Sequence, residues 1–368
     1  MSAPHEVEQF QIGQPQGPAL NAVKGLSLQA RHAVAGERLR SLLVYVAPLA
    51  LLALFPLIAS TYQVSLLAKF LVYALLALSF DLLWGYTGIL SFAHAVFFGL
   101  GAYALALVLK YFGDMPGATY VGIFLAVALP SLLALFIGWA MFFGRVGGVY
   151  FAIVTFAVGA IFQSVTIVWI EFTGGLNGLY GFPNPRLGLP GVWEIELAND
   201  PVSYYLIVMV LFLSLFFARQ LVASPFGRAL RAIKSNEQRV EFLGYNVPQV
   251  KLTVFVISCA LAGLSGALYV PVGFVSADIM GILFSTAIIV WVAVGGRGTL
   301  YGAVLGTLVV NYLQAFMSDI LVFYWFLIIG IFFILVVVLM PDGIAGVVQH
   351  AIRWAAHRRA NRTATSNR

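Results

Sequence analysis

The sequence predicts an all-α integral membrane protein with about ten transmembrane helices. Hydrophobic residues make up 61% of the 368 positions and charged residues only 9%, whereas a soluble domain carries about a quarter charged residues. The mean hydropathy is +0.97. Apolar runs of about 20 residues, the length that crosses the hydrocarbon core as a helix, recur along the chain. These observations exclude a soluble globular protein.

Ten apolar runs approach the length of a membrane span, and polar or glycine-containing segments separate them. The candidate spans are residues 41–59, 64–84, 88–109, 119–143, 147–170, 202–218, 252–271, 279–296, 299–317 and 320–340. Several are short or interrupted by glycine, so we expect roughly nine to eleven helices, some of them broken or re-entrant.

Positive charge predicts the orientation, because Lys and Arg gather on the cytoplasmic side of membrane proteins. With a cytoplasmic N-terminus, 17 of the 20 Lys and Arg residues lie inside, and only Lys69, Lys110 and Arg186 lie outside. Lys69 and Lys110 are near span ends, where a long side chain can reach the interface. The opposite orientation would invert this ratio, so both termini are expected in the cytoplasm.

The ends of the chain are polar. Residues 1–40 are expected to form a disordered cytoplasmic extension and residues 349–368 a basic cytoplasmic tail. No short apolar segment with a cleavage site follows Met1, so no cleaved signal peptide is expected. The pI is about 9.4, but the basic residues lie between apolar runs, which favours membrane orientation over nucleic-acid binding.

The single cysteine, Cys259, lies in an apolar segment. A lone buried cysteine can form neither a disulfide framework nor a cysteine metal cluster, and it is best interpreted as a small core residue. No metal or other cofactor is predicted.

Residues 219–251 form the longest internal cytoplasmic loop of this topology. Ser224 and Pro225 predict a helix start, and Asn236 predicts the cap of a second short helix that ends at Gly244. Two short amphipathic helices can form a compact module that docks into a groove of a partner. The alternative is an ordinary basic loop that contacts anionic membrane lipid.

Several sequence segments resemble the permease subunits of the ABC transporters that take up branched-chain amino acids and urea. The segments are DLLWGYTGILSFAHAVFFGLGAYA (81–104), TGGLNGL (173–179), SPFGRALRAIKSNEQRVEFLGYNVPQVKLTVFVISCALAGLSGALY (224–269), VAVGGRGTLYGAVLGTLVVN (292–311) and MPDGIAGV (340–347). They follow one another in the family's order, and the resemblance covers about residues 40 to 348.

The resemblance implies a transport subunit that is not itself an enzyme, with a permease domain at residues 41–348 in a bacterial cytoplasmic (inner) membrane. The partners implied are a second permease subunit, cytoplasmic ATP-binding subunits and an external substrate-binding protein. The loop at 219–251 would then be the contact for the ATPase. The coupling residues implied are Phe226, Arg228, Arg231, Glu237, Arg239, Phe242 and Leu243.

A flexible external loop is expected where glycines surround an asparagine, and it is a candidate contact for the substrate-binding protein. Its residues are Gly174, Gly175, Asn177 and Gly178.

The substrate class rests on one position of the resemblance. The form GGRGTL, with Arg297, is similar to the urea branch, whereas the amino acid branch more often has an apolar residue there. Urea is therefore favoured, and branched-chain amino acids or short amides are the alternative.

Few polar residues are available to line a pathway. The candidates are Asp81, Thr87, Ser91 and His94. An ionisable group in an apolar run is costly unless it faces a cavity or a partner, and a glycine-broken helix exposes backbone groups. For Asp81 the alternative is a capping or inter-helix role near the cytoplasmic interface, and for His94 it is a neutral packed side chain.

Two other classes of function remain open. A stand-alone secondary transporter or urea channel would need no docking module and would favour buried ion-coupling carboxylates or rings of pore-lining residues. An intramembrane hydrolase would require a nucleophile and a base. Ser91 and His94 have helical i, i+3 spacing, but no oxyanion-type motif accompanies them.

Overall fold

The computed structural model describes residues 51–189, 193–198, 201–320, 330–331 and 343–346. The chain divides into two compact units, residues 1–58 and 59–368. Of the first unit only residues 51–58 are described, and they are helical. The expected extension, the basic tail and most of the candidate spans 41–59 and 320–340 lie outside the described residues.

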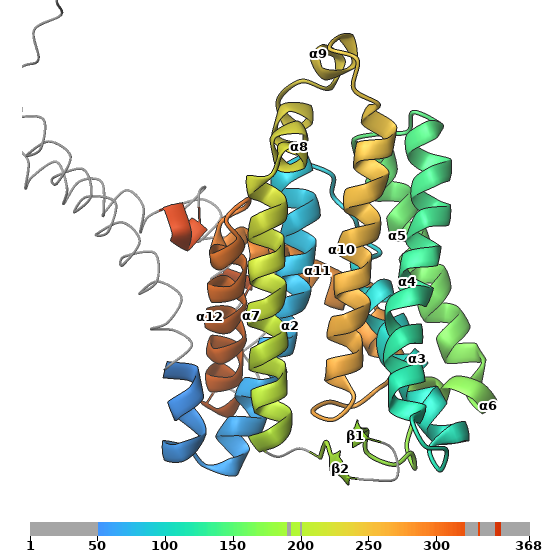
Figure 1. Cartoon of the computed structure of the whole chain (residues 1–368), viewed down its shortest axis with the longest axis vertical. Helices are drawn as coiled ribbons and strands as arrows, with labels where there is room; N and C mark the ends of the chain where they lie inside the picture. Colours follow the sequence, from blue (N-terminus) through green and yellow to red (C-terminus); the bar gives the residue numbers. More distant parts are fainter. Residues whose placement is uncertain (1–50, 190–192, 199–200, 321–329, 332–342, 347–368) are drawn as a thin grey trace, which may run out of the picture. The chain divides into compact units, whose positions relative to one another are not determined.

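Among the residues that the structure describes, seven helices are long and apolar enough to cross a membrane, which supports the predicted all-α membrane architecture. They are α2 (Thr61–Thr87), α3 (His94–Phe112), α4 (Ala118–Phe143), α5 (Val149–Val168), α7 (Pro201–Ala223), α10 (Val247–Tyr269) and α12 (Leu300–Ile320) (Figure 1).

Two of the expected spans differ from the structure. The run 279–296 contains a 3-10 helix, η2 (Ala277–Met280), and a 14-residue helix, α11 (Ile282–Gly295), which is too short to cross a bilayer alone. The run 88–109 is helical only from His94 onward, because residues 88–93 are not helical. Both differences occur beside a glycine, at Gly281 and Gly88, where hydropathy stays high although the helix is interrupted.

Interactions between neighbouring residues define where α2 begins and ends. At its start the Ser60 side chain accepts a hydrogen bond from Gln63 N, and the Gln63 side chain accepts one from Ser60 N, which forms a capping box. At its end Gly88 has φ of 78°, the left-handed conformation that terminates helices. The chain then enters the non-helical segment 88–93, which leads into α3.

Helices α3, α4 and α10 approach one another closely through glycine. A Cβ placed on Gly101 of α3 would overlap the Gly263 backbone of α10, and a Cβ on Gly263 would overlap the Ala126 carbonyl of α4. Small residues allow such contact between membrane helices. Helix α2 packs against this group and is buried almost continuously from Phe70 to Leu83. It is the central helix of the unit.

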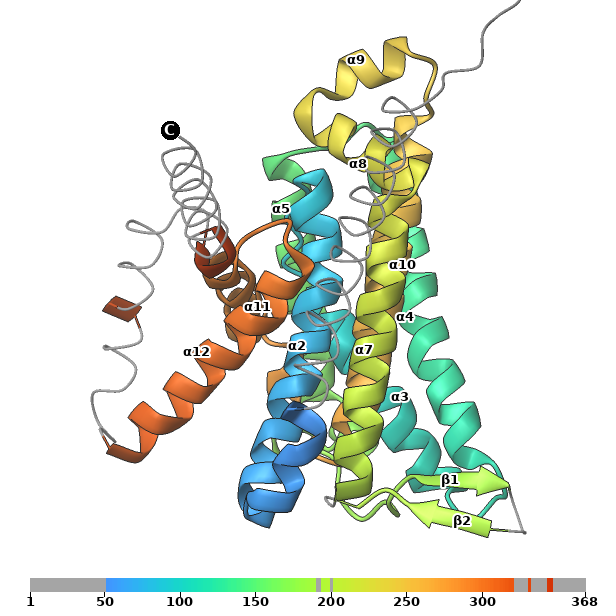
Figure 2. The same ribbon diagram turned by 60° about the vertical axis from the view of Figure 1, so that its left-hand side comes forward.

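The two ends of the unit carry different structures (Figures 1 and 2). At one end lie two short helices, α8 (Pro225–Ser235) and α9 (Glu237–Phe242). At the other lie α6 (Ile170–Thr173), a 3-10 turn and a two-stranded antiparallel hairpin of β1 (Arg186–Leu189) and β2 (Trp193–Glu196). The purely helical prediction missed this hairpin, because four-residue strands show too little alternation to be detected.

Candidate functional site

The module formed by α8 and α9 begins as the sequence predicted. The Ser224 side chain accepts from Gly227 N at 3.4 Å, and Pro225 occupies the first helical turn. The Asn236 side chain accepts from Arg239 N at 3.0 Å and caps α9. These bonds satisfy backbone donors that a helix start otherwise leaves unpaired.

A small apolar cluster and one ion pair attach the module to α10. The buried side chains of Ile233, Val240 and Val247 pack together, one from each of α8, α9 and α10. Glu237 forms an ion pair with the largely buried Lys251 at 2.6 Å. The module is therefore a folded part of this chain and not an unattached basic loop.

The tip of α9 is apolar and exposed. Phe242 is 90% exposed and Leu243 is 76% exposed, although the residues around them are polar. Exposed apolar side chains grouped on a polar surface are characteristic of a protein contact site. Arg228 and Arg239 are also exposed, whereas Phe226 is half-buried.

Two of the expected coupling residues bind within the chain. Arg231 donates from Nη1 to the Val222 carbonyl, near the end of α7, at 3.1 Å. Glu237 is occupied by Lys251. Both contacts form only in the folded chain, so residue spacing in the sequence could not predict them.

A groove of about 520 Å³ lies beside α9 and was not expected from the sequence. Arg145 and Gly147, from the turn after α4, line it together with Glu241 and Gln238 of α9. Arg145 has φ of 56°, a left-handed conformation that is uncommon outside glycine. That conformation depends on the folded turn, so nothing in the sequence distinguished Arg145 from other basic residues.

Asp81 is a buried residue of α2 that contacts the turn before α12. Its carboxylate Oδ1 accepts a hydrogen bond from Gly298 N at 2.7 Å, and Gly298 lies in the turn between α11 and α12. The side chain is fully buried, and Oδ2 has no hydrogen-bond partner among the described residues. The structure therefore gives Asp81 an inter-helix contact, the alternative considered for it.

The module and the 296–299 turn both reach the last turns of α2. The Lys234 ammonium, at the end of α8, donates to the Gly85 carbonyl at 2.6 Å. The Arg297 guanidinium lies over the Trp84 ring, 5.0 Å from its centroid. The close packing needs glycine, because a Cβ on Gly85 would overlap both Asp81 Oδ1 and the Gly298 backbone.

Two of the expected pathway hydroxyls lie at the end of α2 and in the segment 88–93, and their hydrogen bonding differs. Thr87 Oγ1 donates to the Leu83 carbonyl at 2.7 Å and accepts from Ile89 N at 3.2 Å, so it stabilises the end of its own helix. Ser91 is buried, and its Oγ has no partner among the described residues. Thr155 of α5 holds the segment by accepting from Phe92 N at 3.1 Å.

His94 connects three helices. Its Nε2 lies 3.2 Å from both Ser79 Oγ of α2 and Ser258 Oγ of α10. Each serine already donates its single hydroxyl proton to a carbonyl, Ser79 to Leu76 and Ser258 to Ser79. Nε2 therefore carries the proton and donates to the two oxygens, and buried Nδ1 has no partner among the described residues.

This arrangement does not support the hydrolase alternative, because Nε2 of His94 is directed to Ser79 and Ser258 and not to Ser91. Sequence reasoning missed both of these serines. A serine in an apolar helix carries no signal of its own.

The glycine-rich loop expected to be flexible forms an ordered turn. Thr173 Oγ1 accepts from Gly175 N at 3.2 Å, and Leu179 N donates to the Val275 carbonyl at 2.8 Å. Gly174, Gly175 and Gly178 all have positive φ, whereas Asn177 is exposed. The glycines therefore provide a backbone shape, and among the four expected contact residues the exposed polar side chain is that of Asn177.

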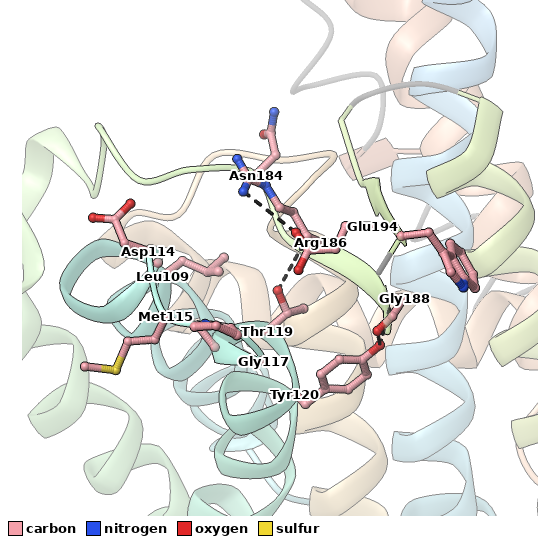
Figure 3. Close-up of a pocket in the computed structure, with 14 residues that line it drawn as sticks. Leu109, Asp114, Met115, Gly117, Thr119, Tyr120, Asn184, Arg186, Gly188 and Glu194 are labelled. Atoms are coloured by element: carbon pink, nitrogen blue, oxygen red, sulfur yellow. Dashed lines mark hydrogen bonds and ion pairs between the residues drawn. The ribbon is translucent and has the colours of Figure 1, made fainter. Parts of the chain in front are cut away.

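A pocket of about 400 Å³ lies between the hairpin and the turn that joins α3 to α4 (Figure 3). Arg186 N donates to Thr119 Oγ1 at 2.9 Å, and the Tyr120 hydroxyl donates to the Gly188 carbonyl at 2.6 Å. Arg186 also lies 3.8 Å from Glu194 across the hairpin (Figure 3). Because the hairpin itself was not predicted, the sequence gave no indication of this pocket.

The bundle of apolar helices, with the non-helical segment 88–93 between α2 and α3, defines a polytopic α-helical membrane protein. A family profile described as the permease component of the branched-chain amino acid transport system matches residues 62–338. The chain belongs to this family.

Curated relatives of this chain are named as branched-chain amino acid transport permeases. The high-affinity branched-chain amino acid transport permease LivM of Escherichia coli K12 is 30% identical over 333 residues, which cover 85% of this chain and 76% of the relative. A probable LivM of Methanocaldococcus jannaschii is 26% identical over 66% of this chain and 77% of its own length. The high-affinity branched-chain amino acid transport permease BraD of Pseudomonas aeruginosa is 26% identical over 67% of this chain and 82% of its own length. No solved structure gives a significant match.

Proposed function

We propose that this chain is a permease subunit of an ATP-binding-cassette importer for branched-chain amino acids. With a second permease subunit it forms the transmembrane pathway, an external substrate-binding protein delivers the solute, and cytoplasmic ATP-binding subunits supply energy. Family membership supports the transport role. The single structural observation that carries the coupling role is the exposed Phe242–Leu243 tip on a module that the chain holds firmly in place.

Branched-chain amino acids replace urea as the favoured substrate. The relatives compared above are named for branched-chain amino acids. The only feature that favoured urea was Arg297, and this side chain lies on Trp84 at the end of α2. Contact with an indole ring explains an arginine at this position without any role in solute selection.

The α8–α9 end is assigned to the cytoplasm and the hairpin end to the outside of a bacterial cytoplasmic membrane. The module and the neighbouring turns carry Arg145, Arg228, Arg231, Lys234 and Arg239, in agreement with the distribution of positive charge across membranes. The permease domain is assigned to residues 41–348.

Ser91 is the pathway group that the geometry favours. Its hydroxyl has no partner among the described residues and lies in a broken helix, the kind of segment that lines solute sites in transporters. Asp81 and His94 bind other parts of the chain, so they shape the pathway by holding helices in position. Thr87 stabilises the end of α2.

The test is reconstitution of the chain in proteoliposomes with its partner permease, ATPase subunits and binding protein. ATP-dependent uptake of radiolabelled leucine, absent when the chain is omitted, is the expected result. Urea uptake in place of leucine uptake would overturn the substrate assignment. Leucine uptake that persists without ATP or the ATPase subunits would overturn the importer assignment in favour of a secondary transporter or channel.

A further inference from the structure

Three parts of the chain meet on the last two turns of α2. They are the end of α8 through Lys234, the turn before α12 through Gly298, and α2 itself through Asp81 and Gly85. Lys234 is 149 residues from Gly85, and Gly298 is 217 residues from Asp81. The meeting point joins the proposed coupling module to the helix that leads directly into the broken segment 88–93.

The polar groups at this point have unused bonding capacity. Asp81 uses one carboxylate oxygen, and the fully buried Oδ2 has no partner among the described residues. Lys234 has an ammonium with three donors, of which one bonds the Gly85 carbonyl. A buried carboxylate is costly without a cation nearby, so the lysine and the aspartate stabilise each other's charge.

The two acceptors lie side by side. Residues 81 and 85 are one helical turn apart on the same face of α2. Because residue 85 is glycine, the Asp81 carboxylate occupies the space that a side chain there would fill. The Gly85 carbonyl that holds the Lys234 ammonium is therefore one helical turn from the Asp81 carboxylate, and the two charges interact electrostatically.

We propose that Lys234 and Asp81 form a polar latch that transmits movement of the coupling module to α2, to the 296–299 turn and thus to the broken segment. In one state the ammonium binds the Gly85 carbonyl, and in the other it binds Asp81 Oδ2. The second acceptor allows α8 to shift while the ammonium keeps a hydrogen-bond partner, and the new bond pairs an oxygen that has no partner among the described residues. This inference rests on the proposed importer function and names the residues that carry its coupling.

The latch explains why a basic residue on an exposed module reaches into α2. A docking surface needs groups that face the partner, and Phe242 and Leu243 satisfy that need. Lys234 instead directs its ammonium to the backbone of α2, so its contribution is to transmission within the chain. Lys234 is thus a positioning residue for transport and not part of the docking tip.

The deciding variant is Lys234→Met, which retains side-chain length and removes the donor. It is compared with wild type and with Lys110→Met in the complete reconstituted complex. Lys110 provides a matched control, since it lies at the far end of α3 with its ammonium over Tyr111. The measurements are ATPase retention on purification, ATP hydrolysis stimulated by loaded binding protein, and leucine imported per ATP.

We expect Lys234→Met to retain its ATPase subunits but to import about tenfold less leucine per ATP, within the range of typical coupling free energies. Lys110→Met should match wild type. An unchanged import ratio in Lys234→Met would overturn the latch while leaving the importer function intact. Loss of the ATPase subunits would also overturn it, because Lys234 would then act in docking.

A double-mutant cycle gives an independent check. Asp81→Asn retains an acceptor for Gly298 N–H but removes the charge that attracts Lys234. If the two residues act as one latch, Asp81→Asn combined with Lys234→Met should lower leucine import per ATP no further than Lys234→Met alone. If the loss of import per ATP in the double variant equals the product of the losses in the two single variants, the residues act independently and the proposal is overturned. If the wild-type complex imports no leucine, the proposed substrate is wrong. That result differs from failure of the latch, in which the wild-type complex imports leucine and Lys234→Met imports as much per ATP.

Discussion

His94 Nε2 and Ser258 Oγ lie 3.2 Å apart although 164 residues separate them in the chain. Because Ser79 of α2 binds the same nitrogen, the Nε2 proton of His94 links α3 to both α2 and α10. We expect Ser258→Ala to lower the free energy of unfolding by about 1 kcal/mol, the usual contribution of a hydrogen bond between membrane helices. Thermal unfolding of the purified protein in detergent measures this.

Ser131→Ala is the matched control for this change. Among the described residues, the Ser131 hydroxyl bonds the Val127 carbonyl of its own helix, at 2.6 Å. Its removal should leave stability nearly unchanged. Equal effects of the two substitutions would contradict a specific cross-helix role for the His94 network.

Gly85→Ala should destabilise the protein strongly. Its methyl group would overlap Asp81 Oδ1 and the Gly298 backbone, and inserting atoms into a packed core costs about 1–3 kcal/mol. Gly147→Ala, where a Cβ meets no atom within 4 Å, should unfold like wild type. Detergent thermal unfolding of both variants tests the prediction, and a wild-type melting temperature for Gly85→Ala would disprove the close contact.

Truncating the α9 tip should detach the ATPase. Phe242→Ala combined with Leu243→Ala removes two apolar side chains that are mostly exposed in the folded chain. Loss of a buried anchor at an interface commonly costs about 2 kcal/mol or more. Co-purification of the ATPase subunits should fall at least tenfold, without a change in thermal stability.

Arg239→Ala is the comparison for the tip. A charge at the rim of an interface alters association rate and salt dependence more than affinity, so this variant should retain its ATPase subunits. Normal ATPase retention by the Phe242/Leu243 double variant would remove the coupling assignment.

Ser91→Ala and Thr87→Val should have opposite consequences. The Ser91 hydroxyl has no partner among the described residues, so its loss should spare stability but raise the KM for leucine uptake by roughly two- to tenfold, the value of one hydrogen bond. Thr87 bonds its own backbone, so Thr87→Val should lower the melting temperature. Unchanged uptake kinetics in Ser91→Ala would assign the serine to packing.

Site-directed labelling can test the orientation in a Cys259→Ser background, since the native cysteine is buried. Gln238→Cys in α9 should react with a membrane-impermeant maleimide only when the cytoplasmic face is accessible. Trp193→Cys in the hairpin should react from outside in intact cells. The reverse pattern would invert the assigned topology.

Local sequence determined the features that depend on neighbouring residues. Span length and hydropathy are properties of one segment, so most of the helices described here were found close to their observed bounds. The caps of α8 and α9 were likewise predictable, because Ser224 and Asn236 bind donors three residues away. Phe242 and Leu243 were implied by the family resemblance, whereas their exposure is a property of the folded module.

The tertiary structure decided which polar groups are occupied. Asp81, His94 and Ser91 appear alike in sequence, as polar residues in or beside apolar helices. Only folding brings Gly298 to Asp81 and Ser258 to His94, while no group of the described chain is brought to Ser91 Oγ. The physical reason is that hydropathy and capping act over a few residues, whereas a hydrogen bond in a membrane core depends on helices that meet from distant parts of the chain.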